Sequence, residues 1–312
     1  MKSTMTQHPI TFFSPSYRGD LERFLLLRRS IRCFAPTTVR HLVAVPSEDA
    51  ARFKRAVADQ PEVELVLQQD LVPRYFYPRR WYPLLKVALP AQAWRFAAHA
   101  GRPGWITQQI VKLSIPQLVS AGPVAILDSD VLFLRPFSLK ELGASNPTRS
   151  LMRAEPTDEA SRHREHMHRA RELLGLPEGP SDHHYMACPA IWYPEWVLAL
   201  QRQLELVSGT DWRRALFDAR TFSEYLLYGV FVEEILKPAD LRVRLERFHA
   251  GVWSVEDFRD LLARRPSPSG LGSGPLTLVV QSNLGIPTTE YLRIAEEYFA
   301  DGRAIRAEPK PY

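Results

Sequence analysis

Cysteine is scarce in this chain of 312 residues, which contains only Cys33 and Cys188. The two are not arranged as a CxxC pair, so the sequence offers no zinc or redox motif of that kind. A single disulfide is one interpretation. We favour the other, which is two buried free thiols in a reducing compartment.

Long apolar runs are also missing. No segment approaches the ~18 apolar residues that a membrane-spanning helix needs. Residues 1–17 (MKSTMTQHPITFFSPSY) lack the continuous apolar stretch of a signal peptide. We therefore expect a soluble, cytoplasmic protein without a transmembrane segment, and peripheral attachment to a membrane stays open.

A strong excess of one charge is absent as well. The chain has 40 Lys and Arg against 35 Asp and Glu, so its net charge is 40 − 35 = +5. The basic residues are interspersed with acidic ones, whereas a nucleic-acid-binding protein usually clusters them, so no nucleic acid is expected as a partner. A P-loop and a GxGxxG motif are both missing, which leaves kinase and dehydrogenase functions without support.

The first third of the chain alternates short strands and helices. Hydrophobic periodicity predicts strands over 10–14, 41–46 and 63–67, with a helix over 20–30 and another starting at Ser47. This order predicts a parallel sheet with helices as crossovers. Ligands of such sheets bind at the carboxyl ends of the strands.

The rest of the chain predicts further elements separated by longer loops. The expected helices cover 105–118, 161–174, 195–206, 223–236 and 288–299, and the expected strands or extended segments cover 124–127, 184–193, 242–248 and 276–280. Loops are expected over 71–83 and 265–275, and a polar tail over 301–312.

An acidic triplet, Asp128-Ser129-Asp130, directly follows the apolar strand 124–127. Two carboxylates two residues apart on an extended backbone project to the same side. Placing them together at the end of a buried strand is unfavourable unless a cation or a proton relieves it. Such oxygen ligands suit Mg²⁺ or Mn²⁺, which would neutralise a diphosphate leaving group. Alternatively, both aspartates lie in a solvated turn and cap the next element.

Residues 104–137 (GWITQQIVKLSIPQLVSAGPVAILDSDVLFLRPF) resemble the DxD region of GT-A glycosyltransferases, especially family 8-like enzymes and the bacterial domain-of-unknown-function 6492 family. Residues 222–229 (FSEYLLYG) also resemble that bacterial family. The resemblance implies an α/β, GT-A-like mixed sheet flanked by helices, in a single domain of two abutting halves. Residues 1–140 would bind the nucleotide sugar and residues 141–300 the acceptor.

The activity implied by this resemblance is that of a hexosyltransferase-like enzyme. It would move a sugar from a nucleoside diphosphate sugar to a hydroxyl of a saccharide or glycolipid acceptor, with Mn²⁺ or Mg²⁺ as cofactor, in surface polysaccharide or glycolipid synthesis. Asp130 would be the direct metal ligand, and Asp128 would contact the ribose or a metal-bound water. Lys112 would touch the donor phosphate or sugar, with Gln109 one helical turn before it.

Further donor contacts are implied just after the first strand. Ser14, Ser16 and Tyr17 lie where such enzymes hold the nucleoside base and ribose. Asp20 could share that task, or it could simply start a helix, because the helix dipole favours an acidic residue there.

The third metal ligand is open at the sequence level. His249, in FHAGVW, follows an expected strand and could be a metal ligand, or it could be an ordinary structural histidine. Family 8-like enzymes place a histidine after the final strand, where this sequence has the amides and hydroxyl of residues 281–283 (QSN) instead.

Two acceptor-side residues have competing interpretations. Glu224 could be the general base of an inverting reaction, or it could cap a helix together with Ser223. In a retaining reaction it would only bind the acceptor. His184, in the run DHHY, could line the sugar site or belong to an ordinary loop. Three histidines on a helix crowded with Arg and Glu are expected to form a solvated face: His163, His166 and His168.

Two other functions compete with transfer. Haloacid-dehalogenase-like phosphatases also end a strand in DxD, but normally on the first strand and with a later acidic pair. Here the triplet begins at Asp128, after three expected strands, and no such pair follows. A non-catalytic nucleotide-sugar-binding protein is the second alternative.

Overall fold

The computed structural model describes most of the chain. The described residues are 10–72, 104–144, 149–154, 160–179, 183–219, 221–245, 249–263 and 275–298. Most of the two expected loops, 71–83 and 265–275, and all of the tail 301–312 lie outside this part.

A five-stranded sheet forms the centre of the molecule, with the order β3-β2-β1-β4-β7. Its first four strands are parallel, and β7 runs antiparallel to β4, which makes the sheet mixed. This confirms the expected α/β class and the parallel pairing of the first third. The strands are β1 (Thr11–Pro15), β2 (Arg40–Val45), β3 (Val63–Leu67), β4 (Val124–Ile126) and β7 (Ala190–Trp192).

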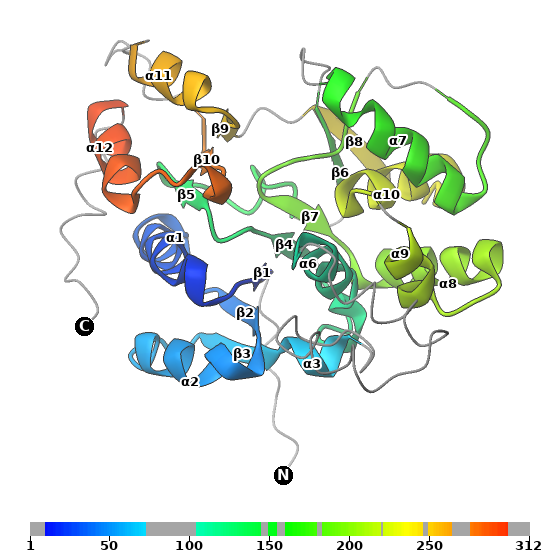
Figure 1. Cartoon of the computed structure of the whole chain (residues 1–312), viewed down its shortest axis with the longest axis horizontal. Helices are drawn as coiled ribbons and strands as arrows, with labels where there is room; N and C mark the ends of the chain where they lie inside the picture. Colours follow the sequence, from blue (N-terminus) through cyan, green and yellow to red (C-terminus); the bar gives the residue numbers. More distant parts are fainter. Residues whose placement is uncertain are drawn as a thin grey trace, which may run out of the picture.

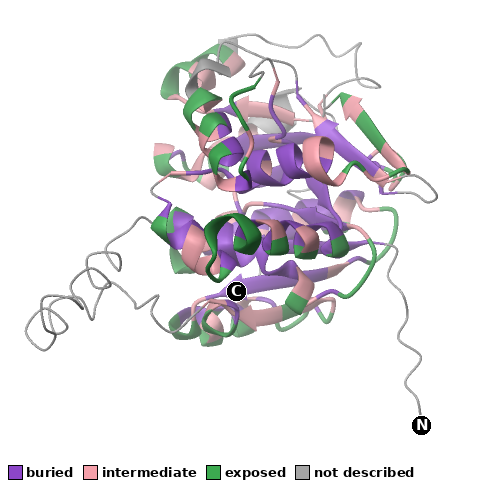
Figure 2. Cartoon of the chain, turned by 90° about the vertical axis from the view of Figure 1, so that its right-hand side faces the viewer, coloured by how far each residue is buried: buried purple, intermediate pink, exposed green. Residues whose placement is uncertain are grey.

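Helices cover both faces of this sheet (Figure 1). Helix α1 (Leu21–Phe34) lies on one side of β1, and α6 (Gly104–Leu113) lies on the other. Because both faces are covered, β1 and β4 are buried along their whole length. Figure 2 shows the buried strands as an inner layer between helices.

Two smaller sheets complete the fold. In one, β5 (Val131–Phe133) pairs antiparallel with β10 (Thr277–Val280), which pairs parallel with β9 (His249–Val252). In the other, β6 (Arg149–Arg153) pairs parallel with β8 (Leu241–Leu245). The chain passes from the main sheet to the second between β4 and β5, so the acidic triplet forms the junction of the two sheets.

The later helices match the expected ones with some changes. The expected helix over 105–118 ends at Leu113 and is followed by the 3₁₀ helix Ile115–Gln117, since Pro116 cannot donate a helical hydrogen bond. The expected extended segment over 184–193 contains only β7 and a single bridge at His184. The other helices are α2 (Ser47–Ala56), α3 (Gln68–Leu71), α7 (Ala160–Leu174), α8 (Pro194–Ser208), α9 (Trp212–Asp218), α10 (Glu224–Val230) with the π-helix Phe231–Leu236, α11 (Val255–Ala263) and α12 (Thr288–Tyr298).

One hydrophobic core joins the two expected halves. It contains Phe12 and Ile126 from the first half together with Trp192, Leu227 and Leu278 from the second. None of the helices in the described ranges has the length and apolar character to cross a membrane.

Candidate active site

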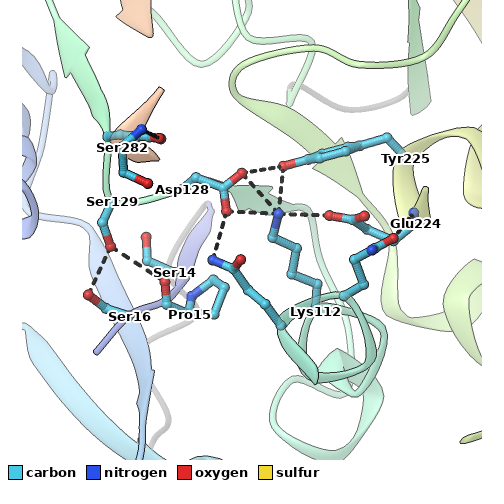
Figure 3. A network of polar contacts seen from close by, with 12 residues as sticks. Ser14, Pro15, Ser16, Lys112, Asp128, Ser129, Glu224, Tyr225 and Ser282 are labelled. Carbon is cyan, nitrogen blue, oxygen red and sulfur yellow. Dashed lines mark hydrogen bonds and ion pairs between the residues drawn. The ribbon is translucent and has the colours of Figure 1, made fainter. Parts of the chain in front are cut away.

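Lys112 lies at the centre of a buried ionic cluster at the carboxyl end of β4 (Figure 3). Its Nζ is 2.8 Å from Asp128 Oδ1 and 2.7 Å from Glu224 Oε1. It also donates to the Tyr225 hydroxyl at 3.1 Å. An ammonium group has three donors, so these partners occupy all of them. Lys112 therefore links two carboxylates and a phenol.

Three elements position this cluster. Helix α6 supplies Lys112, the end of β4 supplies Asp128, and α10 begins at Glu224. Gln109, one turn before Lys112, accepts a hydrogen bond from the backbone N–H of Glu224 at 2.9 Å through Oε1. Gln108 Nε2 lies 3.4 Å from Asp128 Oδ1. The same face of α6 thus fixes the start of α10 and one aspartate of the triplet.

The electrostatics of the cluster favour the charged form of Lys112. Burial lowers the pKa of Lys112, but the carboxylates of Asp128 and Glu224 outweigh burial and hold this pKa well above its usual range. Burial raises the pKa of Glu224, and the Lys112 ammonium opposes part of that rise. Removing either partner would leave a buried charge unpaired, which is costly.

Asp130 occupies a different environment. Its Oδ2 accepts a hydrogen bond from the Ser282 N–H at 3.0 Å, and its carbonyl accepts one from the Val280 N–H at 3.1 Å. Burial and then the neighbouring charge of Asp128 raise the pKa of Asp130 to about 7. This carboxylate therefore carries negative charge that the chain only partly compensates.

The two aspartates do not sit on one extended strand as expected. Residues 129 and 130 form a turn between β4 and β5. Asp128 consequently faces Lys112 and Tyr225, whereas Asp130 faces the end of β10 at Ser282. Their charges still interact, since Asp128 contributes to the raised pKa of Asp130.

Asp20 adds a third carboxylate to this electrostatic group. Burial raises its pKa, Arg23 opposes the rise, and the charge of Asp128 adds to it. Asp20 forms an ion pair with Arg23 at 3.1 Å, and Arg23 Nε donates to the Tyr291 hydroxyl at 3.2 Å. That hydroxyl donates to the Val280 carbonyl at 3.1 Å, so α12 is tied to the site.

The expected donor contacts on β1 differ in accessibility. Ser14 is fully buried, and its Oγ is 2.9 Å from Nε2 of His41. Ser16 is also buried and accepts a hydrogen bond from Ser129 Oγ at 2.9 Å. Tyr17 is 51% exposed at the carboxyl end of β1. Ser16 thus contacts the acidic triplet from within and Ser14 contacts β2, whereas Tyr17 is the one of these three that solvent reaches.

His249 is not brought to the acidic triplet. In β9 it pairs with Thr277, whereas the Val280 N–H is the one that reaches the Asp130 carbonyl. Three residues along a strand correspond to about 10 Å. The alternative position after the final strand does reach the triplet, through the backbone of Ser282.

His184 lies in a β-bridge with Ala154. Its Nδ1 accepts a hydrogen bond from the Met186 N–H at 3.3 Å, and its ring lies 5.5 Å from the ring of His163. We expected His163, His166 and His168 of α7 to form a solvated face. Because His163 lies against His184, this expectation holds only in part.

Sequence reasoning missed several polar partners in the site. Tyr225 follows Glu224 directly in FSEYLLYG, and this adjacency was an available signal. The link from Arg23 to Tyr291 spans 268 residues and has no local pattern that could reveal it.

A divalent cation fits this charge distribution. The named cluster contains four carboxylates, those of Asp20, Asp128, Asp130 and Glu224, but only two cationic side chains, those of Arg23 and Lys112. Within the described ranges, no group of three His, Cys, Asp or Glu side chains could hold a metal. Mg²⁺ and similar ions typically use one or two carboxylates and complete their shell with water and substrate phosphates. Asp130, whose charge the chain only partly compensates, would be one such carboxylate, whereas Asp128 already pairs with Lys112.

Comparisons with known proteins identify the family and the fold of this chain. Residues 8–303 match the model of a family described as "Family of unknown function (DUF6492)". The curated proteins contain no match. Among solved structures, galactosyltransferase LgtC in complex with donor and acceptor sugar analogs has a TM-score of 0.51 and 11% identity, over 92% of this chain and 96% of that chain.

Two further solved structures are less similar. The bifunctional glycosyltransferase WbbM has a TM-score of 0.49 and 11% identity, over 97% of this chain and 52% of its own. Mouse xyloside xylosyltransferase 1 has a TM-score of 0.47 and 9% identity, over 89% and 99% of the two chains. At such identities the similarity to LgtC shows the fold alone, and that fold is GT-A-like.

Proposed function

Since the chain belongs to the DUF6492 family and has a GT-A-like fold, we propose that it is a metal-dependent glycosyltransferase. It transfers a sugar from a nucleoside diphosphate sugar to a hydroxyl of a saccharide or glycolipid acceptor. The observation that carries this proposal is the excess of carboxylates where the two sheets meet, at the carboxyl ends of parallel strands. Ligands of open α/β sheets bind at such ends.

In this proposal the two aspartates of the triplet have different tasks. Asp130 binds Mn²⁺ or Mg²⁺, and Asp128 provides the second carboxylate. When bound, the ion supplies positive charge for the diphosphate leaving group. Ser282 holds the Asp130 carboxylate in place through its backbone N–H.

Lys112 and Glu224 act mainly by positioning. The ammonium of Lys112 is already satisfied by protein partners, so its contribution to a donor phosphate is to fix the direction of Asp128. Glu224 neutralises Lys112 and holds the start of α10 against α6. This ion pair favours a positioning role for Glu224 over the general-base role expected from the sequence.

The donor nucleoside binds beside the carboxyl end of β1. Tyr17 provides an exposed ring for the base, and Asp20, which pairs with Arg23 and senses the charge of Asp128, lies close enough to share in binding the ribose. The cytoplasm supplies both nucleotide sugars and Mg²⁺, so we place the enzyme there, acting in surface polysaccharide or glycolipid synthesis.

A thermal-shift screen tests this proposal. The wild-type protein would be melted with UDP-, GDP- and CDP-sugars, each with and without Mn²⁺. One donor class should raise the Tm by several degrees, and only when the ion is present. The matched variant Asp130→Asn should lose this shift. A donor-induced shift that is equal in the presence of a chelator would refute metal dependence.

The alternative functions make different predictions in the same protein. A phosphatase would hydrolyse a simple phosphate ester with the ion alone, and the GT-A-like fold gives it no support. A non-catalytic binding protein would show the donor-induced shift but no release of nucleoside diphosphate. Measuring that release with and without candidate acceptors separates the three.

A further inference from the structure

One face of α6 extends from the ionic cluster to the protein surface. Trp105, Gln108, Gln109 and Lys112 follow the spacing i, i+3, i+4 and i+7, which places them on the same side of a helix. Gln108 and Lys112 contact Asp128, and Gln109 contacts the backbone of Glu224. Trp105 lies at the outer end of this face, about 10 Å along the helix from Lys112, and is 38% exposed.

The ring of Trp105 packs against two other rings. His166 of α7 meets it edge-on, with ring centroids 6.2 Å apart and an interplanar angle of 81°. Phe222 packs at 6.4 Å and is fully buried, and it directly precedes Ser223 and Glu224. Trp105 is therefore held by the same segment that positions the ionic cluster, while part of its surface stays open.

Two buried nitrogen atoms beside this face lack hydrogen-bond partners in the described part of the chain. They are Gln109 Nε2 and His166 Nδ1. The amide of Gln109 cannot simply be reversed, because its Oε1 is fixed by the Glu224 N–H. Leaving a buried polar atom unpaired is costly, so a ligand that supplied hydroxyl groups here would recover free energy.

We propose that Trp105 is the stacking platform for the acceptor saccharide, with Gln109 and His166 as its polar partners. This inference rests on the proposed transferase function and names the acceptor class of the same site. A pyranose ring combines an apolar face of C–H groups with hydroxyls at its edge. It therefore fits a flat aromatic ring flanked by an amide and an imidazole.

The test compares Trp105→Ala and Trp105→Phe with wild type and with Leu198→Ala. Leu198 lies on α8 and is 39% exposed, so it controls for the loss of a similarly exposed apolar side chain. The probes are the methyl glycosides of glucose, galactose and N-acetylglucosamine, observed by saturation-transfer NMR. At least one glycoside should receive saturation on its C–H face from wild type and Leu198→Ala, with a roughly tenfold loss of affinity in Trp105→Ala. Trp105→Phe should retain most of the binding.

The kinetic readout uses the glycoside that binds. Trp105→Ala should raise its KM about tenfold with a smaller change in kcat, while the Mn²⁺-dependent shift in Tm caused by the donor stays the same. Failure of that donor shift in wild type would refute the proposed function itself. Equal glycoside binding by wild type and Trp105→Ala, or no binding of any glycoside to wild type, would overturn the acceptor platform.

Discussion

The two aspartates of the triplet lie on two sides of the site, which we call its walls. The walls differ in how far their hydrogen-bond donors and cations offset the negative charge of the aspartate. On the wall formed by α6 and α10, Asp128 accepts bonds from Lys112 and Tyr225, and the ammonium that it shares with Glu224 offsets part of its negative charge. On the wall formed by β10, Asp130 receives one backbone N–H from Ser282, and its pKa is raised to about 7. One carboxylate is thus fixed by the protein itself, and the other carries a charge that suits a bound cation.

We therefore expect the two sides of the site to differ in role: the α6–α10 side stabilises the fold, and the β10 side binds the ligand. The α6–α10 wall contains a buried ion pair whose loss should damage the fold. The β10 wall contains a destabilising charge, and such a charge is retained where binding requires it. Four variants or conditions test this division, from the largest expected effect to the smallest.

Replacing Lys112 should damage the fold most. Lys112→Met leaves the buried carboxylate of Glu224 without a partner, and we expect a loss of about 3–5 kcal/mol in the free energy of unfolding. Urea denaturation measures it. The double variant Lys112→Met/Glu224→Gln should recover much of the loss, because the buried charge is removed. A loss below about 1 kcal/mol in the single variant would show that the pair is not structural.

Replacing Asp130 should affect ligand binding and spare the fold. Asp130→Asn keeps the shape of the side chain and removes a charge that lies near Asp128 and Asp20. Its Tm without metal should equal or exceed that of wild type, and the Mn²⁺-dependent shift with a nucleotide sugar should disappear. A large drop in Tm without ligand would place Asp130 among the structural residues instead.

The free energy of unfolding should depend on pH because the pKa of Asp130 differs between the folded and unfolded states. Its pKa rises from 3.8 to about 7 on folding, so the folded state binds the proton more tightly than the unfolded state. The stabilising contribution is therefore complete below about pH 4 and is lost as the pH rises through 7. In a chelator, the unfolding free energy of wild type minus that of Asp130→Asn should fall across this range. A difference that is independent of pH would contradict the raised pKa.

Removing the hydrogen bonds that connect α12 to β10 should have the smallest effect on the free energy of unfolding. Tyr291→Phe removes the hydroxyl that accepts from Arg23 and donates to the Val280 carbonyl, at an expected cost of about 1 kcal/mol in unfolding free energy. Tyr17→Phe, which alters an exposed tyrosine, should be neutral. Equal stability of the two variants would show that the Tyr291 hydroxyl of α12 does not stabilise β10.

The sequence was informative where a pattern is local. Short runs rich in apolar residues predicted β1, β3 and β4, of which β1 and β4 are buried along their whole length and β3 is only partly buried. The short strands β5 and β9 were missed, since three or four residues carry too little periodicity.

The site was predictable only where its residues are close in sequence or matched by resemblance. Asp128, Asp130 and Lys112 fall in one block; the structure pairs Lys112 with Asp128, and Asp130 interacts with Asp128 through its charge. The partner of Lys112, Glu224, lies 112 residues away, so only the packing of α10 against α6 reveals the pair. The place of His249 depended on strand register, and no local pattern specifies which end of β9 meets the triplet.

The most direct test of the central claim is calorimetric titration of Mn²⁺ into the protein with and without UDP, GDP or CDP. If Asp130 holds an ion that in turn binds a diphosphate, one nucleotide should increase Mn²⁺ affinity at least tenfold in wild type and leave Asp130→Asn unchanged. Equal Mn²⁺ affinity with and without every nucleotide, or the same increase in both proteins, would contradict the account.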